Sequence, residues 1–101
     1  MNIYDMMKQF KNIQESMEAI KEELRQRKEI LEKDGVEVVH NGLGEVVDIS
    51  VSDDSLRDDW SKLKPLLIDL INEVQSRSRD IMKEEFSRRF GGLLGGMGLG
   101  L

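Results

Sequence analysis

The sequence VEVVHNGLGEVVDISV, residues 36–51, decides the fold of this chain. Two β-branched runs flank Asn41-Gly42-Leu43-Gly44, and Asn-Gly between such runs is typical of a β-hairpin because both residues tolerate positive φ. A two-residue loop at Asn41-Gly42 would set Val38 against Glu45. A four-residue loop matches apolar with apolar residues, so we prefer that register. Its pairs are Val36 with Ile49, Val38 with Val47, Val39 with Val46, and His40 with Glu45.

This register gives the hairpin one apolar face and one more polar face. The apolar face holds Val36, Val38, Val47, Ile49 and Val51. A lone hairpin is marginal in water, so we expect the flanking helices to cover this face. At least one strand edge has no partner in the same chain, and an open edge calls for a loop or a second subunit. We therefore interpret the hairpin as the organising element of a homodimer.

Residues 3–26 form the clearest predicted helix, with Asn2 as its N-cap. Its apolar residues follow the a/d heptad pattern of helices that wind together. These seam residues are Ile3, Met6, Phe10, Ile13, Met17, Ile20 and Leu24.

Arg27 breaks this pattern and leaves two possibilities. The helix either continues as a solvated extension to about Lys33, or it ends near Arg27. We favour the second possibility, in which residues 28–32 form a first strand. A three-residue turn, Lys33-Asp34-Gly35, would then place Ile30 opposite Val38 on the apolar face.

An acidic run follows the hairpin at Asp53, Asp54, Asp58 and Asp59. It resembles a metal site superficially, but Asp and Ser commonly cap helices, and no further ligands lie nearby. We expect a short helical turn over residues 55–59 and a long helix over residues 62–89.

The long helix is predicted to start at the cap Ser61, with Pro65 tolerated in its first turn and Trp60 packed over its start. Its predicted buried residues are Leu66, Leu67, Leu70, Ile71, Val74, Ile81, Met82 and Phe86. Gly91 and Gly92 are expected to end it, and residues 91–101 form a flexible Gly-rich tail.

The chain is long enough for one small domain, which we place at residues 1–90, and the predicted elements make it α+β with a meander of two or three strands. The chain has 101 residues, of which 35% are charged and 5% aromatic, so its core is thin and aliphatic. Such chains often complete their core by oligomerising. There is no cysteine, signal peptide or long apolar run, which predicts a cytoplasmic protein with no membrane contact.

No catalytic pattern is present. His40 is the only histidine, and a histidine near a turn and opposite Glu45 is more often structural than a general base. Gly42 and Gly44 do not form a dinucleotide fingerprint, and no Ser-His-Asp set or phosphate loop occurs. We expect no enzyme activity, cofactor, metal or small-molecule substrate.

The basic residues of the helices are the more informative group. Beside the apolar seam of the first helix, and just beyond its end, lie Lys21, Arg25 and Lys28. The last helix carries Arg77, Arg79 and Lys83. These residues are either solvated helix surfaces with ordinary salt bridges or contacts to phosphate. A net charge of −5 argues against a general polyanion binder but allows a local basic stripe.

The order of elements, with several short motifs, resembles the YbaB/EbfC family of bacterial nucleoid-associated proteins. The motifs are Met7-Lys8-Gln9, residues 41–46 (NGLGEV), residues 51–56 (VSDDSL), residues 70–74 (LINEV), and Lys83-Glu84-Glu85 before the glycine tail. Asp53 replaces the family's usual proline, which leaves that turn less rigid. The glycine-rich link between the first two strands is shortened to residues 33–35.

The resemblance implies a homodimer with projecting helical arms that binds duplex DNA in the nucleoid with little sequence preference and no cofactor. The six basic residues named above are the predicted contacts. A second hypothesis is a prefoldin-like coiled-coil chaperone or protein-interaction module. It requires continuous heptads on both long helices, and Asp69, Arg77 and Ser78 interrupt the pattern on the last one.

Overall fold

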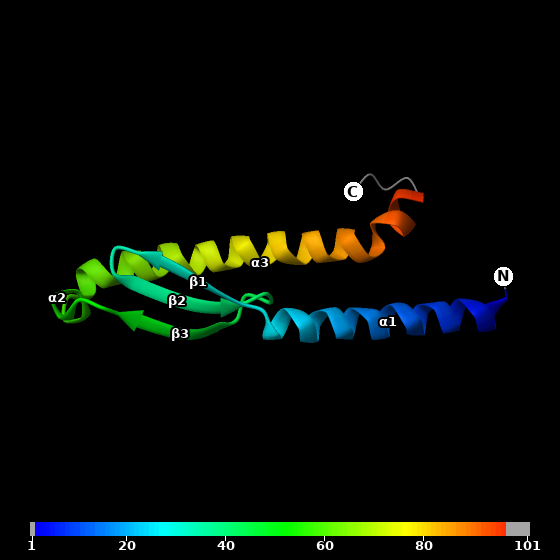
Figure 1. Cartoon of the computed structure of the whole chain (residues 1–101), viewed down its shortest axis with the longest axis horizontal. Coiled ribbons are helices and arrows are strands. Elements are labelled where there is room, and N and C mark those ends of the chain that lie inside the picture. The colour runs from blue at the N-terminus through cyan, green and yellow to red at the C-terminus, as the bar shows by residue number, and fades with distance from the viewer. Residues whose placement is uncertain (1, 97–101) are drawn as a thin grey trace.

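The computed structural model describes residues 2–96 and the side chains of residues 2–91. Its elements in chain order are α1 (Ile3–Gln26), β1 (Lys28–Lys33), β2 (Val36–Asn41), β3 (Val46–Val51), α2 (Asp54–Arg57) and α3 (Trp60–Gly96) (Figure 1). The predicted α+β fold is confirmed, with three strands. The molecule is elongated, with a radius of gyration of 19.1 Å. A compact chain of this length would have about 13 Å.

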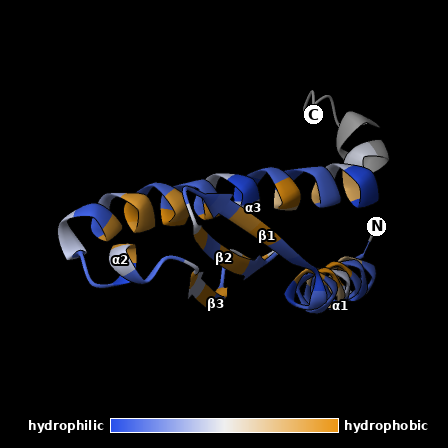
Figure 2. Ribbon diagram, turned by 60° about the vertical axis from the view of Figure 1, so that its left-hand side comes forward, coloured by the Kyte–Doolittle hydropathy of each residue, from blue (hydrophilic) through white to orange (hydrophobic). Residues whose placement is uncertain are grey.

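The sheet is antiparallel, with strand order β1-β2-β3. α3 lies along one face of the sheet, close to β1 and β2, and β3 is farther from it (Figure 2). Val36 and Val38 of β2 are fully buried against Leu63, Leu70 and Val74 of α3. The β2 part of the hairpin's apolar face is thus covered by a flanking helix, as the sequence predicts, whereas Ile49 of β3 is 45% exposed.

The predicted register of the hairpin is wrong. Val36 pairs with Val51 and Val38 with Ile49, which is a shift of two residues. The cause is a bulge, because His40 pairs with Val46 and Val39 with Asp48, leaving Val47 as an extra residue on β3. Since the shift is even, Val36, Val38, Ile49 and Val51 still share a face.

The turn between β1 and β2 also differs from the prediction. It has two residues, Asp34 and Gly35, and both have positive φ, which is the geometry of a type I′ turn. Lys33 therefore pairs with Val36, and Leu31 rather than Ile30 lies opposite Val38. Leu31 packs on the core, whereas Ile30 is 62% exposed.

The N-terminal helix has the predicted bounds. Asn2 caps it, since its Oδ1 accepts a hydrogen bond from the Asp5 amide at 2.9 Å. The helix ends at Gln26, and Arg27 turns directly into β1, so the shorter of the two predicted helices is correct. The Gly42 amide donates to the carbonyl oxygens of Leu24 (2.8 Å) and Arg27 (3.0 Å), which satisfies carbonyl groups at the helix end.

α3 differs from its prediction at both ends. It begins at Trp60, so Ser61 is not its cap, Pro65 lies in the second turn, and Trp60 is 62% exposed rather than packed. The helix is assigned to Gly96, past the end predicted at Gly91 and Gly92. The predicted flexible tail runs into residues 97–101, which lie outside the described residues.

The buried face of α3 is narrower than predicted. Leu70, Val74 and Ile81 are buried, and Leu66 and Leu67 pack at the edge of the core. Leu63 and Ser78 are buried as well, although they were not in the predicted set. The other three predicted residues, Ile71, Met82 and Phe86, are exposed.

Two small cores lie along the molecule, joined by the β2–β3 turn. The first joins the sheet to α3. The second consists of Ile20, Leu24 and Ile81, with Leu43 of the turn and Phe90 against it. Between them the Ser78 hydroxyl donates to the Gly42 carbonyl at 3.1 Å. The turn therefore contacts both long helices.

We expect Gly44→Ala to destabilise the protein by about 1–3 kcal/mol. Gly44 has a φ of 83°, and a Cβ there would lie 3.0 Å from the Ser78 hydroxyl and 3.1 Å from the Ser78 Cβ. Gly91→Ala is the control, because its Cβ would meet nothing within 4 Å and alanine favours helix. Urea unfolding measures both, and equal stability of the two variants would contradict this account of the turn.

Candidate nucleic-acid interface

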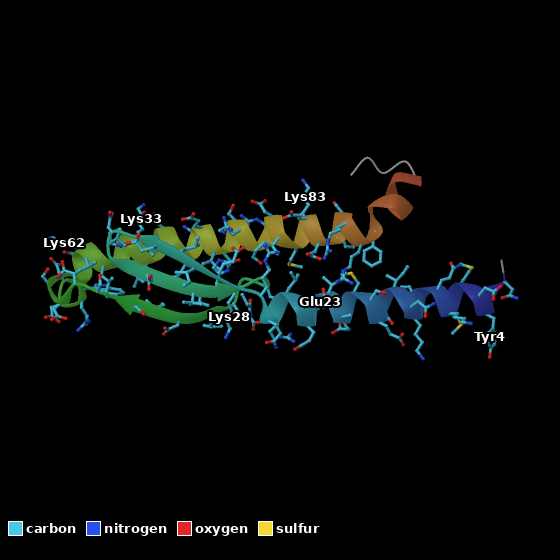
Figure 3. The ribbon with its side chains drawn as sticks, in the orientation of Figure 1. Tyr4, Glu23, Lys28, Lys33, Lys62 and Lys83 are labelled. Carbon is cyan, nitrogen blue, oxygen red and sulfur yellow. The ribbon has the colours of Figure 1, made fainter. Side chains whose placement is uncertain are left out.

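The basic residues predicted to contact DNA fall into two groups. Lys21 and Arg25 lie one turn apart near the end of α1, and Lys28 begins β1. Arg77, Arg79 and Lys83 lie on α3, but at 100° per residue Arg77 is on a different side from the other two. Lys83 points away above α3, whereas Lys28 lies below the sheet (Figure 3). One protomer does not bring all six together.

Three of the six residues are engaged in ion pairs. Lys21 lies 3.5 Å from a Glu18 carboxylate oxygen, and Arg25 pairs with Glu22. Arg77 donates from Nε and Nη2 to Oε2 of Glu29, at 3.0 and 2.8 Å. Among the described residues, Lys28, Arg79 and Lys83 form no ion pair. Surface pairs contribute little energy, so a phosphate could displace the exposed carboxylates of α1.

Arg77 and Glu29 form the most embedded of these pairs. The Glu29 side chain is 21% exposed, and Oε1 also accepts from Arg27 Nη2 at 3.3 Å. The hydrogen bond from Arg77 is the main cause that lowers the pKa of Glu29 below its ordinary value of 4.5, with the charges of Arg77 and Arg27 adding to it. The pair joins β1 to α3 across 48 residues of sequence, so it positions Arg77 against the sheet.

Sequence reasoning missed a second set of contacts between the helices. Arg89 near the end of α3 bonds Glu23 of α1 and lies 3.7 Å from Glu85. Glu23 lies between the two helices in Figure 3. Since 66 residues separate Arg89 from Glu23, no local pattern signals the contact. In the sequence Arg27 stands out only as a break in the heptads, whereas in the structure it contacts Glu29.

Within the acidic run after β3, Asp53 caps α2, as predicted. Asp53 Oδ1 accepts from the Ser55 amide at 2.9 Å and from the Ser55 hydroxyl at 2.7 Å. Both bonds lower the pKa of Asp53. Asp59 accepts from the Ser61 hydroxyl at 2.6 Å, and Asp54 pairs with Arg57. Within residues 2–96 no group of three or more potential ligands is placed to hold a metal ion.

Most of the apolar seam predicted for residues 3–24, which we call the α1 seam, is left uncovered by the described part of the protomer. Ile20 and Leu24 are buried, but Ile3 is 75% and Phe10 63% exposed, and Met6 and Ile13 are exposed too. The N-terminal part of α1 extends away from the sheet (Figure 1). On the sheet, Val47 and Ile49 of the outer strand β3 are about half exposed. Both surfaces offer exposed apolar side chains to a partner.

The described helices include none that is long and apolar enough to cross a membrane.

Comparisons with known proteins agree with this description. The model of the YbaB/EbfC DNA-binding family matches residues 1–93. The chain is 39% identical to a nucleoid-associated protein of Sulfurihydrogenibium sp., over 89% of this chain and 84% of that protein. It is 32% identical to one from Pelotomaculum thermopropionicum, over 91% and 90% of the two chains, and 41% identical to one from Nitratiruptor sp., over 73% of each. No solved structure gives a significant match.

We expect Glu29→Gln to lower the free energy of unfolding by about 1 kcal/mol at pH 7. The folded-state pKa of Glu29 is lowered, so its stabilising effect is present above pH 4.5 and is lost as the pH falls through that lowered pKa. The two proteins should converge in stability at strongly acidic pH. Urea titrations of the wild type and the variant, at pH 7 and at strongly acidic pH and at one protein concentration, measure the difference in their free energies of unfolding. A difference that persists in acid would show that the ion pair is not its cause.

Proposed function

The chain belongs to the YbaB/EbfC DNA-binding family, and we propose that it binds duplex DNA as a homodimer with little sequence specificity. The observation that carries this proposal is the match of the family model over residues 1–93, together with relatives named as nucleoid-associated proteins. We further propose that it acts in the cytoplasm, at the nucleoid, where broad binding could affect gene expression.

The uncovered α1 seam supports the homodimer. Four apolar residues of the seam, Ile3, Met6, Phe10 and Ile13, are exposed on the N-terminal part of α1, which none of the other described elements covers. An a/d seam pairs most readily with a matching seam, and a second copy supplies one. The exposed apolar residues of β3 and its open edge offer a second, continuous surface for the same partner.

Helix-borne cations support binding to the DNA backbone. Lys21, Arg25 and Lys28 lie at the end of α1, where that helix meets the sheet, and they are exposed. Arg79 and Lys83 share the side of α3 that faces away from the sheet, and Arg77 lies at its flank. Lysine and arginine on helices reach phosphates without reading base edges, so little sequence preference is expected. In a homodimer, the two-fold axis would give two copies of each group of cations.

The prefoldin-like alternative has less support. It needs two long helices whose seams are both free for coiled-coil pairing. The buried side of α3 is instead occupied by the sheet, through Leu63, Leu70 and Val74. Only α1 presents a free seam, which favours one dimer contact rather than a pair of client-holding arms.

We expect Lys21→Glu, Arg25→Glu and Lys28→Glu together to abolish binding of duplex DNA while the dimer stays intact. Reversing three charges replaces phosphate attraction with repulsion at one surface. Gel mobility shifts with several unrelated duplexes, in a salt series starting at about 50 mM, measure the effect. The wild-type affinity should fall steeply as salt rises, and equally for each duplex.

The matched control reverses Lys33, Lys62 and Lys64 to Glu, which changes the net charge equally. Lys33 and Lys62 lie at the end of the molecule remote from α1 (Figure 3). If both triple variants lose binding equally, net charge and not a local surface is responsible. Wild-type protein that fails to bind at the lowest salt, or binds independently of salt, would contradict the proposed function.

We expect Phe10→Asp to convert the dimer into a monomer, because a charge in the middle of the α1 seam cannot be buried without a partner. Light scattering coupled to size exclusion should give about 11.6 kDa for this variant and twice that mass for the wild type. Asn12→Asp is the control, since it adds a charge to the opposite side of α1. If the Phe10→Asp variant is still a dimer, the dimer interface does not lie on the α1 seam.

A further inference from the structure

His40 is buried beneath α3 with one ring nitrogen unsatisfied. Its side chain is 0% exposed, and Nδ1 lies 2.8 Å from the Asn41 carbonyl oxygen. A carbonyl oxygen only accepts, so Nδ1 carries the proton in the neutral ring and Nε2 is left as an acceptor. Nε2 has no hydrogen-bond partner among the described residues. A buried polar atom in this state destabilises the fold, because it has lost its hydrogen bond to water and gained none.

The charged group nearest to Nε2 is the carboxylate that holds Arg77. His40 pairs with Glu29 across β1 and β2, and Nε2 lies 3.9 Å from Glu29 Oε2. The same oxygen accepts both hydrogen bonds from Arg77. One carboxylate oxygen therefore lies between a buried imidazole and an arginine that was predicted to contact DNA.

The remaining charges around His40 do not offer Nε2 another acceptor. Arg27, at the end of α1, bonds the other oxygen of Glu29. Glu45, after the β2–β3 turn, accepts from the Asn41 side chain at 2.8 Å and lies 3.8 Å from Arg25. From α3, the polar group that contacts this turn is the Ser78 hydroxyl, which does not titrate in the neutral range, while Ile81 packs against Leu43. A proton on Nε2 would thus be directed at Glu29.

The two cations that compete for Glu29 differ in access to water. A protonated His40 is fully enclosed and cannot be hydrated, so it needs the carboxylate. The Arg77 side chain is 46% exposed and can exchange Glu29 for water or a phosphate. When both groups are charged, Arg77 is therefore the cation whose release costs less, since it can be hydrated and repulsion from the imidazolium weakens its hold on Glu29.

We propose that protonation of His40 transfers Glu29 from Arg77 to His40 and so frees the Arg77 guanidinium for a DNA phosphate. The imidazole takes one proton from solvent at Nε2, Glu29 stays ionised, and Arg77 keeps its charge throughout. By linkage the effect is reciprocal, so DNA that engages Arg77 promotes protonation of His40. DNA binding is then stronger in mildly acidic conditions. This inference rests on the proposed function.

The test is DNA affinity between about pH 8 and pH 6, where histidine is the side chain that ordinarily changes charge. His40 is the only histidine and there is no cysteine, so the chain suits this measurement. Fluorescence anisotropy of a labelled duplex at constant ionic strength should show affinity rising about tenfold toward pH 6. Glu29→Gln should bind tightly at both pH values, and Arg77→Gln weakly at both, each without the pH dependence.

A second readout avoids substituting the buried histidine. The ring protons of His40 give the only histidine signals in a proton NMR titration, and their midpoint should move to higher pH when duplex DNA is added. The same shift should be absent in Arg77→Gln. Salt-sensitive binding with no dependence on pH and an unmoved midpoint would overturn the inference and leave the proposed function standing. Failure to bind at any pH would instead overturn the proposed function.

Discussion

The structure depends on the backbone hydrogen bonds of one residue, Gly42. Its amide donates to the carbonyl oxygens of Leu24 and Arg27 at the end of α1, and its carbonyl accepts from Ser78 of α3. The turn that carries this residue is itself held by Asn41, whose Oδ1 accepts from the Leu43 and Glu45 amides at 3.0 Å each. Three elements distant in sequence are fixed at this one point.

This junction explains the elongated shape and the surface left for a partner. It holds only the last turns of α1, so Ile20 and Leu24 are buried while the remainder of the seam projects from the body. The sheet and α3 form one aliphatic core, and the end of α1 forms another with Ile81. Neither core is large, and a second copy that covers the seam would add the apolar burial that one chain lacks.

Local signals in the sequence were sufficient for the elements but not for their register. The heptads and the cap Asn2 gave the bounds of α1, and the Asn-Gly loop located the hairpin. The register failed because Val47 forms a bulge, and a bulge leaves no mark on an alternating pattern. The Asp34-Gly35 turn did carry a signal, since Asp-Gly favours a two-residue type I′ loop, but three residues were assigned to it.

The candidate interface was less accessible to sequence reasoning. Helical spacing correctly separates Arg77 from Arg79 and Lys83, because that depends on 100° per residue alone. The partners of these cations depend on tertiary contacts instead. Glu29 lies 48 residues from Arg77, and nothing near either residue indicates the pair or the buried His40 beside it.

Amide hydrogen exchange at Gly42, followed by NMR, tests the central claim most directly. If the backbone of Gly42 ties α1 and α3 to the sheet, its amide should exchange only on global unfolding, as slowly as the amide of the buried core residue Val74. Exchange at the rate of an unstructured loop amide, with Val74 still protected, would show that the turn does not hold the two helices and would contradict the account.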